Sequence, residues 1–171
     1  MGSLGHDAAP LIPRILVYCD SDGSSEYVRW SAVRAVCGIA LATIEDALGR
    51  ACRLVTPSSR RLYNRHLAAA APQIRGCLVR CMDDAFYKIR QEALERMHAL
   101  ARLERAYEQF KATKAAVDCG FDDPCPLSLR GGSLVDEVRE RAGAMARCDA
   151  HAAVRKAAAR LLDVLEEEEE E

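Results

Sequence analysis

The feature of the sequence that most constrains the fold is a charge-free run from Ala35 to Ile44. It reads AVCGIALATI, and a helix built from it is apolar on every side. Such a helix is either buried in a protein core or inserted in a membrane. The run is far shorter than the roughly 20 residues that a bilayer requires, and the charged residues Arg34 and Glu45 flank it directly. The surrounding stretch, Ser25–Val55, is therefore predicted to be the central helix of a soluble bundle.

Composition favours a helical fold built as one domain. The chain has 171 residues, of which 50% are hydrophobic and only 5% aromatic, and alanine, leucine, arginine and glutamate are abundant. These residues favour helix, and a chain of this length most simply folds as one domain with a substantial core. We place that domain at residues 14–165. A flexible leader is expected at residues 1–13 and a disordered acidic tail at residues 166–171.

One short segment has the composition of a strand. Residues Arg14–Cys19 (RILVYC) form a β-rich apolar run between a proline and a turn-forming sequence. A single strand cannot satisfy its own backbone hydrogen bonds, and its candidate partners are residues 52–55 and 77–80. Two folds are open: a mainly α-helical bundle with at most a minor N-terminal strand, and a small three-stranded α/β sheet with helices outside it. We favour the bundle, because three strands are few for this length and the second half offers no more.

The clearest periodicity lies further along, where Cys77–Val117 is predicted to form one long helix. Apolar residues recur there at intervals of three and four, which places them in one stripe. The stripe consists of Phe86, Ile89, Ala93, Leu100, Leu103, Tyr107 and Phe110. A last helix is expected to begin at the capping residue Ser133 and to carry an apolar stripe from Leu134 to Leu165. Because a loop joins the two helices, they are predicted to form a long antiparallel helical hairpin.

The stripe from Phe86 to Phe110 is the predicted partner-binding site. An apolar stripe of this length has to be covered by a helix of the same chain, of a second copy or of another protein. The predicted function is therefore a non-enzymatic helical protein–protein interaction module, an adaptor or assembly subunit that works through coiled-coil-like helix faces. No cofactor is predicted.

A first alternative function comes from Asp20-Ser21-Asp22-Gly23-Ser24, which follows the expected strand directly. This sequence resembles the first motif of haloacid dehalogenase-type phosphatases. The resemblance implies a magnesium-dependent phosphatase with Asp20 as nucleophile and Asp22 as acid or base. The later lysine and acidic pair of that family have no counterpart here. A turn and helix cap use the same residue types, so this function is kept as the alternative.

A second alternative comes from Leu62-Tyr63-Asn64, near the start of an expected helix. It is similar to the tripeptide of LYR-type mitochondrial accessory proteins, which are small helical bundles. Asn64 stands where that family has arginine, although Arg65 follows. The resemblance implies an accessory protein that assembles with a mitochondrial component.

Charge and cysteine content bear on partners and location. The formal net charge is −2, and removing the six charges of Glu166–Glu171 leaves +4. That is too weakly basic to indicate nucleic-acid binding, so protein partners or self-association are expected, with no nucleic acid and no membrane. No secretory signal precedes the eight cysteines, which are expected to stay reduced in the cytoplasm or nucleus. Cys77 and Cys81 are interpreted as buried thiols, because zinc needs four converging ligands.

Overall fold

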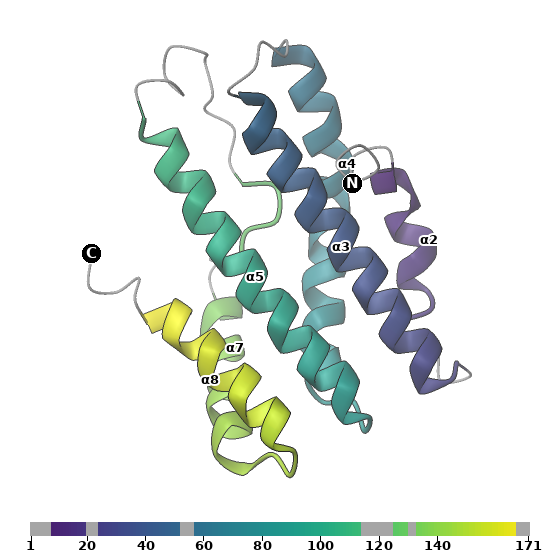
Figure 1. Ribbon diagram of the computed structural model, residues 1–171. Helices are drawn as coiled ribbons and strands as arrows, with labels where there is room; N and C mark the ends of the chain where they lie inside the picture. Colours follow the sequence, from purple (N-terminus) through teal and green to yellow (C-terminus); the bar gives the residue numbers. More distant parts are fainter. Residues whose placement is uncertain (1–7, 20–23, 52–56, 114–124, 130–132, 167–171) are drawn as a thin grey trace.

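The computed structural model describes residues 8–19, 24–51, 57–113, 125–129 and 133–166 of the chain. Within these residues the chain forms helices and no strand, so the predicted mainly α-helical bundle is confirmed (Figure 1). The 3-10 helix η1 (Ala9–Leu11) is followed by α2 (Ile12–Leu16), α3 (Glu26–Ala51), α4 (Pro57–Cys81), α5 (Tyr87–Lys111), α7 (Ser133–Cys148) and α8 (Ala152–Glu166).

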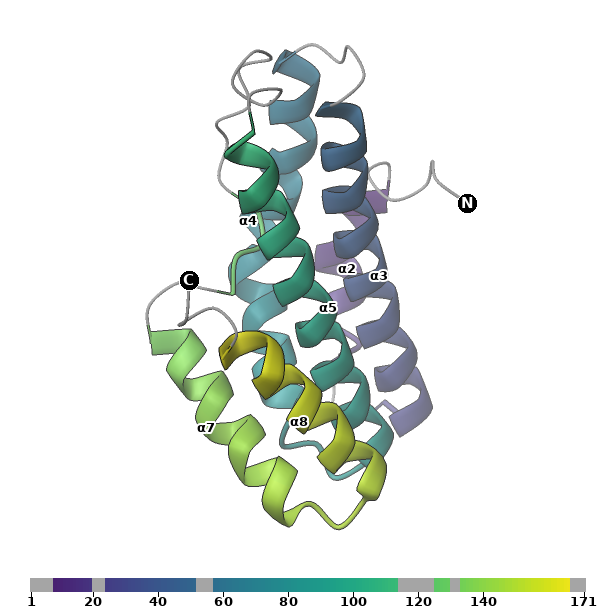
Figure 2. The ribbon, with the colours of Figure 1, turned by 60° about the vertical axis from the view of Figure 1, so that its left-hand side comes forward.

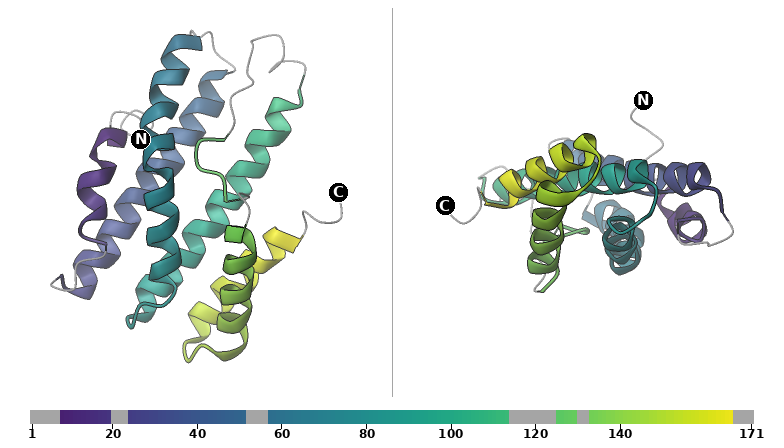
Figure 3. Two further views of the ribbon diagram at one scale, coloured as in Figure 1. Left: turned by 180° about the vertical axis from the view of Figure 1, so that it is seen from behind. Right: turned by 90° about the horizontal axis from the view of Figure 1, so that it is seen from below.

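The helices pack in two layers. Seen from below, α8, α5 and α3 lie side by side in one layer, and α7, α4 and α2 lie in the other (Figure 3). Helix α3 contacts α2, α4 and α5, and α5 in turn contacts α8. Figure 2 shows α7 and α8 folded back on each other beside one half of α5. The core therefore runs between the layers and continues under this hairpin.

Helix α3 has the central position that its charge-free run predicts. Its first turn is capped by Ser25, whose Oγ accepts a hydrogen bond from the Val28 amide at 3.4 Å. The following turns bury an apolar face in the core, made of Val33, Val36, Cys37, Ala40 and Ile44. By length and composition alone, the segment Glu26–Glu45 would also be able to cross a membrane. Core helices of soluble proteins share that composition.

A glycine in the middle of α3 gives a first testable prediction. No atom outside the local helix backbone lies within 4 Å of the position that a Cβ would take at Gly38. We expect Gly38→Ala to raise the free energy of unfolding by about 0.5–1 kcal/mol, because alanine loses less backbone entropy than glycine in a helix. Urea denaturation measures the gain. Gly143→Ala is the comparison, since its Cβ would lie 3.3 Å from Arg147 Nη1 and the gain there should be smaller. A loss of stability in Gly38→Ala would contradict the prediction.

The N-terminal strand prediction is wrong, because Arg14–Cys19 folds as α2 and the turn after it. Helical spacing places Ile12, Leu16 and Cys19 on one face, and all three are buried in the core. A strand would have pointed its side chains alternately to two faces and left its backbone without a partner. The helix also begins inside the predicted leader, where Ala9 is buried, so the described part of residues 1–13 packs on the bundle.

The α/β alternative and the single long helix are also corrected. Residues 77–80 belong to α4, which runs through Pro72 without ending, while residues 52–55 lie outside the described part. The predicted helix Cys77–Val117 is interrupted between Cys81 and Tyr87. At this break the Phe86 amide donates to Asp84 Oδ1 at 2.8 Å. A short polar side chain that binds the backbone two residues on favours a turn over a helix.

The expected last helix is divided into α7 and α8 by a turn at Asp149–His151. These two helices form a hairpin with each other, whereas the predicted hairpin paired the helix that carries Phe86–Phe110 with an undivided last helix. Helix α8 packs along α5. The break follows the same rule as the previous one, because the His151 amide donates to Asp149 Oδ1 at 2.9 Å. Glu166 is the last residue of α8, and the remainder of the predicted acidic tail, residues 167–171, lies outside the described part.

A short segment without helix, residues 125–129, fills the space between α4 and α5. It buries Cys125, Leu127 and Leu129 in the core. The buried carboxylate of Glu104 holds it by accepting hydrogen bonds from the Ser128 hydroxyl and from the Leu129 amide, the latter at 2.9 Å. Arg75 donates to the Ser128 carbonyl at 2.9 Å from the α4 side. These contacts satisfy backbone groups that burial would otherwise leave unpaired.

Candidate functional site

The predicted partner-binding stripe lies inside the protein. Ile89, Ala93, Leu100 and Tyr107 are at most 1% exposed. Phe86, Leu103 and Phe110 are partly buried against the same core. The stripe is covered by the chain's own helices, chiefly α3 and α8. Of the coverings that the sequence left open, the described structure shows the chain's own helices, because the two-layer packing places α5 between neighbours on both sides. A function of the stripe in partner binding stays a prediction.

A row of aromatic rings instead crosses the end of the bundle at which α3 begins. The Tyr27 and Phe86 ring centroids lie 5.7 Å apart, and those of Phe86 and Tyr87 also lie 5.7 Å apart, both edge to face. Tyr87 then stacks on the His151 imidazole at 4.2 Å with an interplanar angle of 3°. These four residues are called the aromatic row. It joins α3, the turn before α5, α5 itself and the turn before α8.

Cationic side chains lie over the rings at the α3 end of the row. The Lys88 ammonium is 5.9 Å from the Tyr27 centroid and 6.0 Å from those of Trp30 and Phe86. The Arg34 guanidinium lies 4.9 Å above the Trp30 ring. A cation attracts the electron-rich face of an aromatic ring at these distances. This end of the row therefore combines apolar surface with positive charge.

The turn before α5 is held by the carboxylate of Asp84. It accepts two hydrogen bonds from the Arg29 guanidinium, each 3.2 Å long, in a bidentate pair. Arg29 also donates to the Ser24 carbonyl at 2.8 Å. Since Asp84 also accepts from the Phe86 amide, one carboxylate fixes the start of α3 against the backbone that carries the Phe86 ring.

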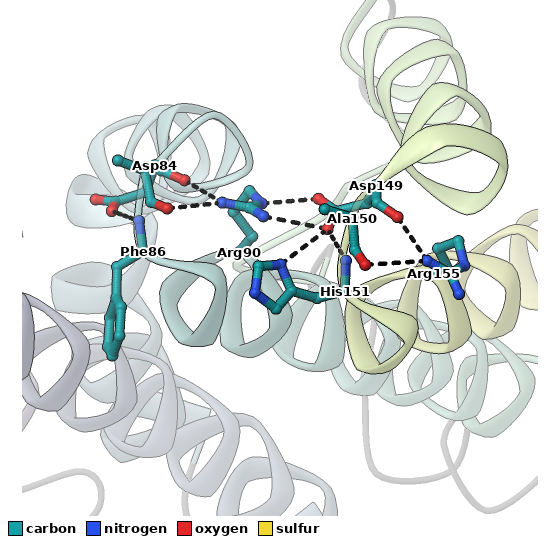
Figure 4. A network of polar contacts seen from close by, with 8 residues as sticks. Asp84, Phe86, Arg90, Asp149, Ala150, His151 and Arg155 are labelled. Atoms are coloured by element: carbon teal, nitrogen blue, oxygen red, sulfur yellow. Dashed lines mark hydrogen bonds and ion pairs between the residues drawn. The ribbon is translucent and has the colours of Figure 1, made fainter.

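Arg90 connects this turn with the turn before α8, as Figure 4 shows. Its guanidinium donates to Asp149 at 2.8 Å and 3.1 Å and to the Asp84 carbonyl at 2.7 Å. The side chains of Arg90 and Asp149 are only 15% and 8% exposed. On the far side, Arg155 donates to the Asp149 carbonyl at 2.7 Å. The two turns that present Phe86 and His151 are therefore fixed by one polar network.

Asp149 remains ionised in this network down to low pH. Partial burial opposes ionisation, but hydrogen bonds from Arg90 and from the His151 amide outweigh it and lower the pKa of Asp149 below its usual 3.8. The carboxylate therefore keeps its bonds to Arg90 throughout the neutral range. The His151 ring stays close to it, with Nδ1 3.6 Å from Asp149 Oδ1.

Behind the row, the α3–α5 seam contains a buried carboxylate. Glu92 accepts a hydrogen bond from the Trp30 indole at 3.0 Å and another from Arg96 at 2.8 Å. Arg34 reaches it as an ion pair at 3.6 Å. A buried carboxylate needs partners of this kind to offset its desolvation. These bonds also fix the orientation of the Trp30 ring beneath Lys88.

The large exposed hydrophobic residues of the described chain lie close together in the sequence. They all lie in the first 28 positions: Leu11 (47%), Val17 (65%), Tyr18 (55%), Tyr27 (58%) and Val28 (45%). Tyr27 belongs to the row, and Val28 is its neighbour in the first turn of α3. A recess of about 400 Å³ lies between α2 and α4, lined in part by Val17 and Arg80. Exposed apolar patches of this kind mark interaction surfaces.

The residues of the two alternative functions are not brought into a site by the described structure. Asp20 and Asp22 lie outside the described residues, so the phosphatase motif stays a prediction. Leu62-Tyr63-Asn64 lies within α4, which begins at Pro57. That helical position does not distinguish an accessory protein from any other bundle.

The cysteines nearest to one another occupy the core. The Cys77 and Cys81 sulfurs are 3.9 Å apart, and Cys37 is also buried. Burial, and then the neighbouring Cys77, raise the pKa of the Cys37 thiol to about 12. Such a thiol is neither a nucleophile nor a ready metal ligand at neutral pH. Among the residues that the structure describes, no group of His, Cys, Asp and Glu is arranged to hold a metal ion.

The aromatic row was not predicted from the sequence. Its rings come from positions as far apart as Tyr27 and His151, and each has an unremarkable local context. The signal that could have found it is the pair of aspartates, Asp84 and Asp149, each two residues before an aromatic or imidazole residue. Both bind the backbone amide two residues on, and both mark the turns that carry the rings.

Comparison with known proteins adds no family to this description. Searches of protein-family models, curated proteins and solved structures find no match for the chain.

Proposed function

We propose that the chain is a non-enzymatic helical protein–protein interaction module, an adaptor or assembly subunit, that binds its partner through the aromatic row. This keeps the interaction function expected from the sequence and moves the binding surface. The stripe on α5 stabilises the fold, and the end of the bundle contacts the partner. Neither nucleic acid nor membrane is part of the proposal.

The observation that carries the proposal is a rigid, exposed aromatic surface. Tyr27 is 58% exposed, yet its ring packs against Phe86, whose backbone is fixed through Asp84. Binding surfaces are enriched in tyrosine, tryptophan and arginine, and a few such residues supply most of the affinity. Side chains that are already ordered lose little entropy on binding. The Arg29 and Arg90 networks provide that order here.

The chemistry of the row also limits the kind of partner. Tyr27 and Val28 offer apolar surface, while Lys88 and the half-exposed Arg34 place positive charge beside it. A complementary protein segment presents apolar side chains together with one or more carboxylates. Charge complementarity of this kind selects partners and increases the rate of association.

Replacement of Tyr27 is the direct test. We expect Tyr27→Ala to weaken partner binding, or self-association if the partner is a second copy, on the order of tenfold or more. Thermal stability should change little, because the side chain is mostly exposed. Light scattering after size exclusion, over a wide concentration range, measures self-association. For a different partner, a photo-reactive phenylalanine at position 27 captures it covalently, and the isolated complex is then titrated with both variants.

Lys156 on α8 supplies the matched control, because it is exposed and belongs to neither the row nor its networks. A photo-reactive residue at position 156 should not capture the same protein, and Lys156→Ala should bind normally. Capture of the same proteins from both positions, combined with a monomeric mass at every concentration, would rule out the aromatic row as a specific binding surface.

A further inference from the structure

A basic pocket lies between α5 and α8. It has a volume of about 510 Å³, which is within the range of small-molecule sites. Its polar lining comprises His98, Arg102, Arg105, Gln109, Arg160 and Asp163. The pocket is separate from the aromatic row in composition and in the residues that form it.

Helical spacing explains why these residues share one pocket. On α5, His98, Arg102, Arg105 and Gln109 follow one another at intervals of three and four, which places them in a single polar stripe. The stripe lies beside the buried apolar stripe of the same helix. Since α8 packs along α5, the three-residue spacing of Arg160 and Asp163 brings both to the opposite wall.

Three arginines, Arg102, Arg105 and Arg160, make the pocket basic, and among the described residues that line it Asp163 is the one carboxylate. Neither Arg102 nor Arg160 forms a hydrogen bond or an ion pair with another residue of the described chain, and both are exposed. Arg90, in contrast, makes four hydrogen bonds. The pocket therefore contains guanidinium donors that are available to a ligand from solvent.

His98 responds to this positive environment. Partial burial lowers the pKa of His98 below 6.5, and the neighbouring Arg102 and Arg160 lower it further, against a smaller opposing effect of Asp163. Its imidazole is therefore neutral at pH 7. A neutral imidazole offers one donor and one acceptor to a ligand.

We propose that this pocket binds a small organic phosphate carrying at least two negative charges. The planar guanidinium fork matches a phosphate group with two parallel hydrogen bonds. The ligand's two negative charges match the guanidinium groups of Arg102 and Arg160, the two exposed arginines of the lining. Ala106 and Val164 complete the lining and provide apolar contact for the carbon part of the ligand.

A small ligand fits better than a nucleic acid. Proteins that bind single strands combine an extended basic groove with aromatic platforms for the bases. None of the described residues that line this pocket is aromatic, and its described walls are short stretches of two helices. The lining residues therefore suit a ligand that combines a phosphate group with a compact apolar part.

Titration calorimetry with the full-length chain in a phosphate-free buffer tests the proposal. The probes are pyrophosphate, ribose 5-phosphate and citrate, the last as a carboxylate anion of similar charge. We expect pyrophosphate and ribose 5-phosphate to bind and citrate to bind at least about tenfold more weakly, because each carboxylate of citrate carries one charge on two oxygens, whereas a phosphate group concentrates nearly two charges on three oxygens. Equal binding of citrate, or no heat from either phosphate at millimolar concentration, would overturn the proposal.

Variants locate the binding in the pocket. The double variant Arg102→Ala and Arg160→Ala should lose at least about tenfold in affinity, because two charge-assisted contacts are removed. Arg147→Ala removes an exposed arginine of α7 outside the pocket and should bind like the wild type. An equal loss in Arg147→Ala would indicate attraction to basic surface in general and would contradict the site.

A gain of affinity excludes misfolding as the explanation. Asp163→Asn removes the one carboxylate among the described lining residues and should strengthen pyrophosphate binding by about threefold, the effect expected from loss of one repulsive charge near solvent. A damaged fold would weaken binding instead. Unchanged or weaker binding by a folded Asp163→Asn variant would also count against the pocket.

Discussion

Replacing Arg90 with methionine should lower the free energy of unfolding by about 3 kcal/mol, the lower end of the cost of breaking a buried ion pair. The substitution leaves the 8% exposed Asp149 without its bidentate partner. It also removes donors from the carbonyls of Asp84 and Ala85. Urea denaturation at pH 7 measures the change. In a thermal melt, a loss of this size corresponds to about 6–12 °C for a chain of this length.

Arg155→Met is the matched control. Arg155 donates to the carbonyls of Asp149 and Ala150, so its loss removes hydrogen bonds without leaving a carboxylate unpaired. We expect it to cost about 1 kcal/mol. If Arg90→Met cost no more than Arg155→Met, the Arg90–Asp149 pair would not be the connection between the two turns.

The pH dependence provides an independent check on the Arg90 prediction. The pKa of Asp149 is lowered in the folded state, so the stabilisation by this group is complete above its unfolded value of 3.8 and is lost as pH falls through the folded value. The stability difference between wild type and Arg90→Met should therefore be constant near neutrality and narrow below pH 3.8. If the stability difference between wild type and Arg90→Met stayed the same in acid, lost packing rather than the lost ion pair would explain it.

Leu100→Ala should cost about 2–5 kcal/mol, because it creates a cavity in a packed core. Leu100 is 1% exposed and belongs to the stripe that the sequence offered as a partner-binding site. Leu103→Ala is the control from the same stripe. Its side chain is only partly buried, so its truncation should cost less. Urea denaturation of the two variants and the wild type measures the difference.

The dependence of the urea denaturation midpoint on protein concentration shows whether the stripe is buried in the core of one chain or at an interface between copies. If the chain's own helices cover the stripe, the denaturation midpoint of the wild type is independent of protein concentration. If a second copy covered it, the midpoint would rise with concentration, because association stabilises the folded state by mass action. If the denaturation midpoint rose between low and high micromolar protein, the stripe would be an interface between copies, as the sequence predicted.

Local sequence signals predicted the helices and their main faces. The charge-free run placed α3 at the centre. The spacing from Phe86 to Phe110 predicted one continuous helix with one buried face, which α5 has. These features depend on residues within a few turns of one another, so one sequence is enough to reveal them.

The errors arose where tertiary contacts outweigh local preference. Ile15, Val17 and Tyr18 favour a strand by residue type, but α3 offers a surface on which the same segment buries Ile12 and Leu16 as a helix. The breaks before α5 and before α8 depend on single aspartates whose side chains bind nearby amides. Asp84 and Asp149 resemble many solvent-exposed aspartates in sequence, and only their distant partners, Arg29 and Arg90, distinguish them.

The aromatic row and the basic pocket could not be predicted for the same reason. Each is assembled from elements far apart in the chain: Tyr27 with His151 in one case, and His98 with Arg160 in the other. Periodicity shows which residues share a face of one helix. It does not show which face of another helix lies opposite, and that relation creates both surfaces.

The hydrogen bond from the Trp30 indole to Glu92 makes tryptophan fluorescence a probe of where unfolding begins. Trp30 is the one tryptophan of the chain, and it lies at the seam between α3 and α5. Its fluorescence follows separation of that seam, whereas detachment of α7 and α8 would leave the indole in place. Comparing tryptophan emission with far-ultraviolet circular dichroism during denaturation therefore distinguishes release of the C-terminal hairpin from collapse of the whole bundle, without an added label.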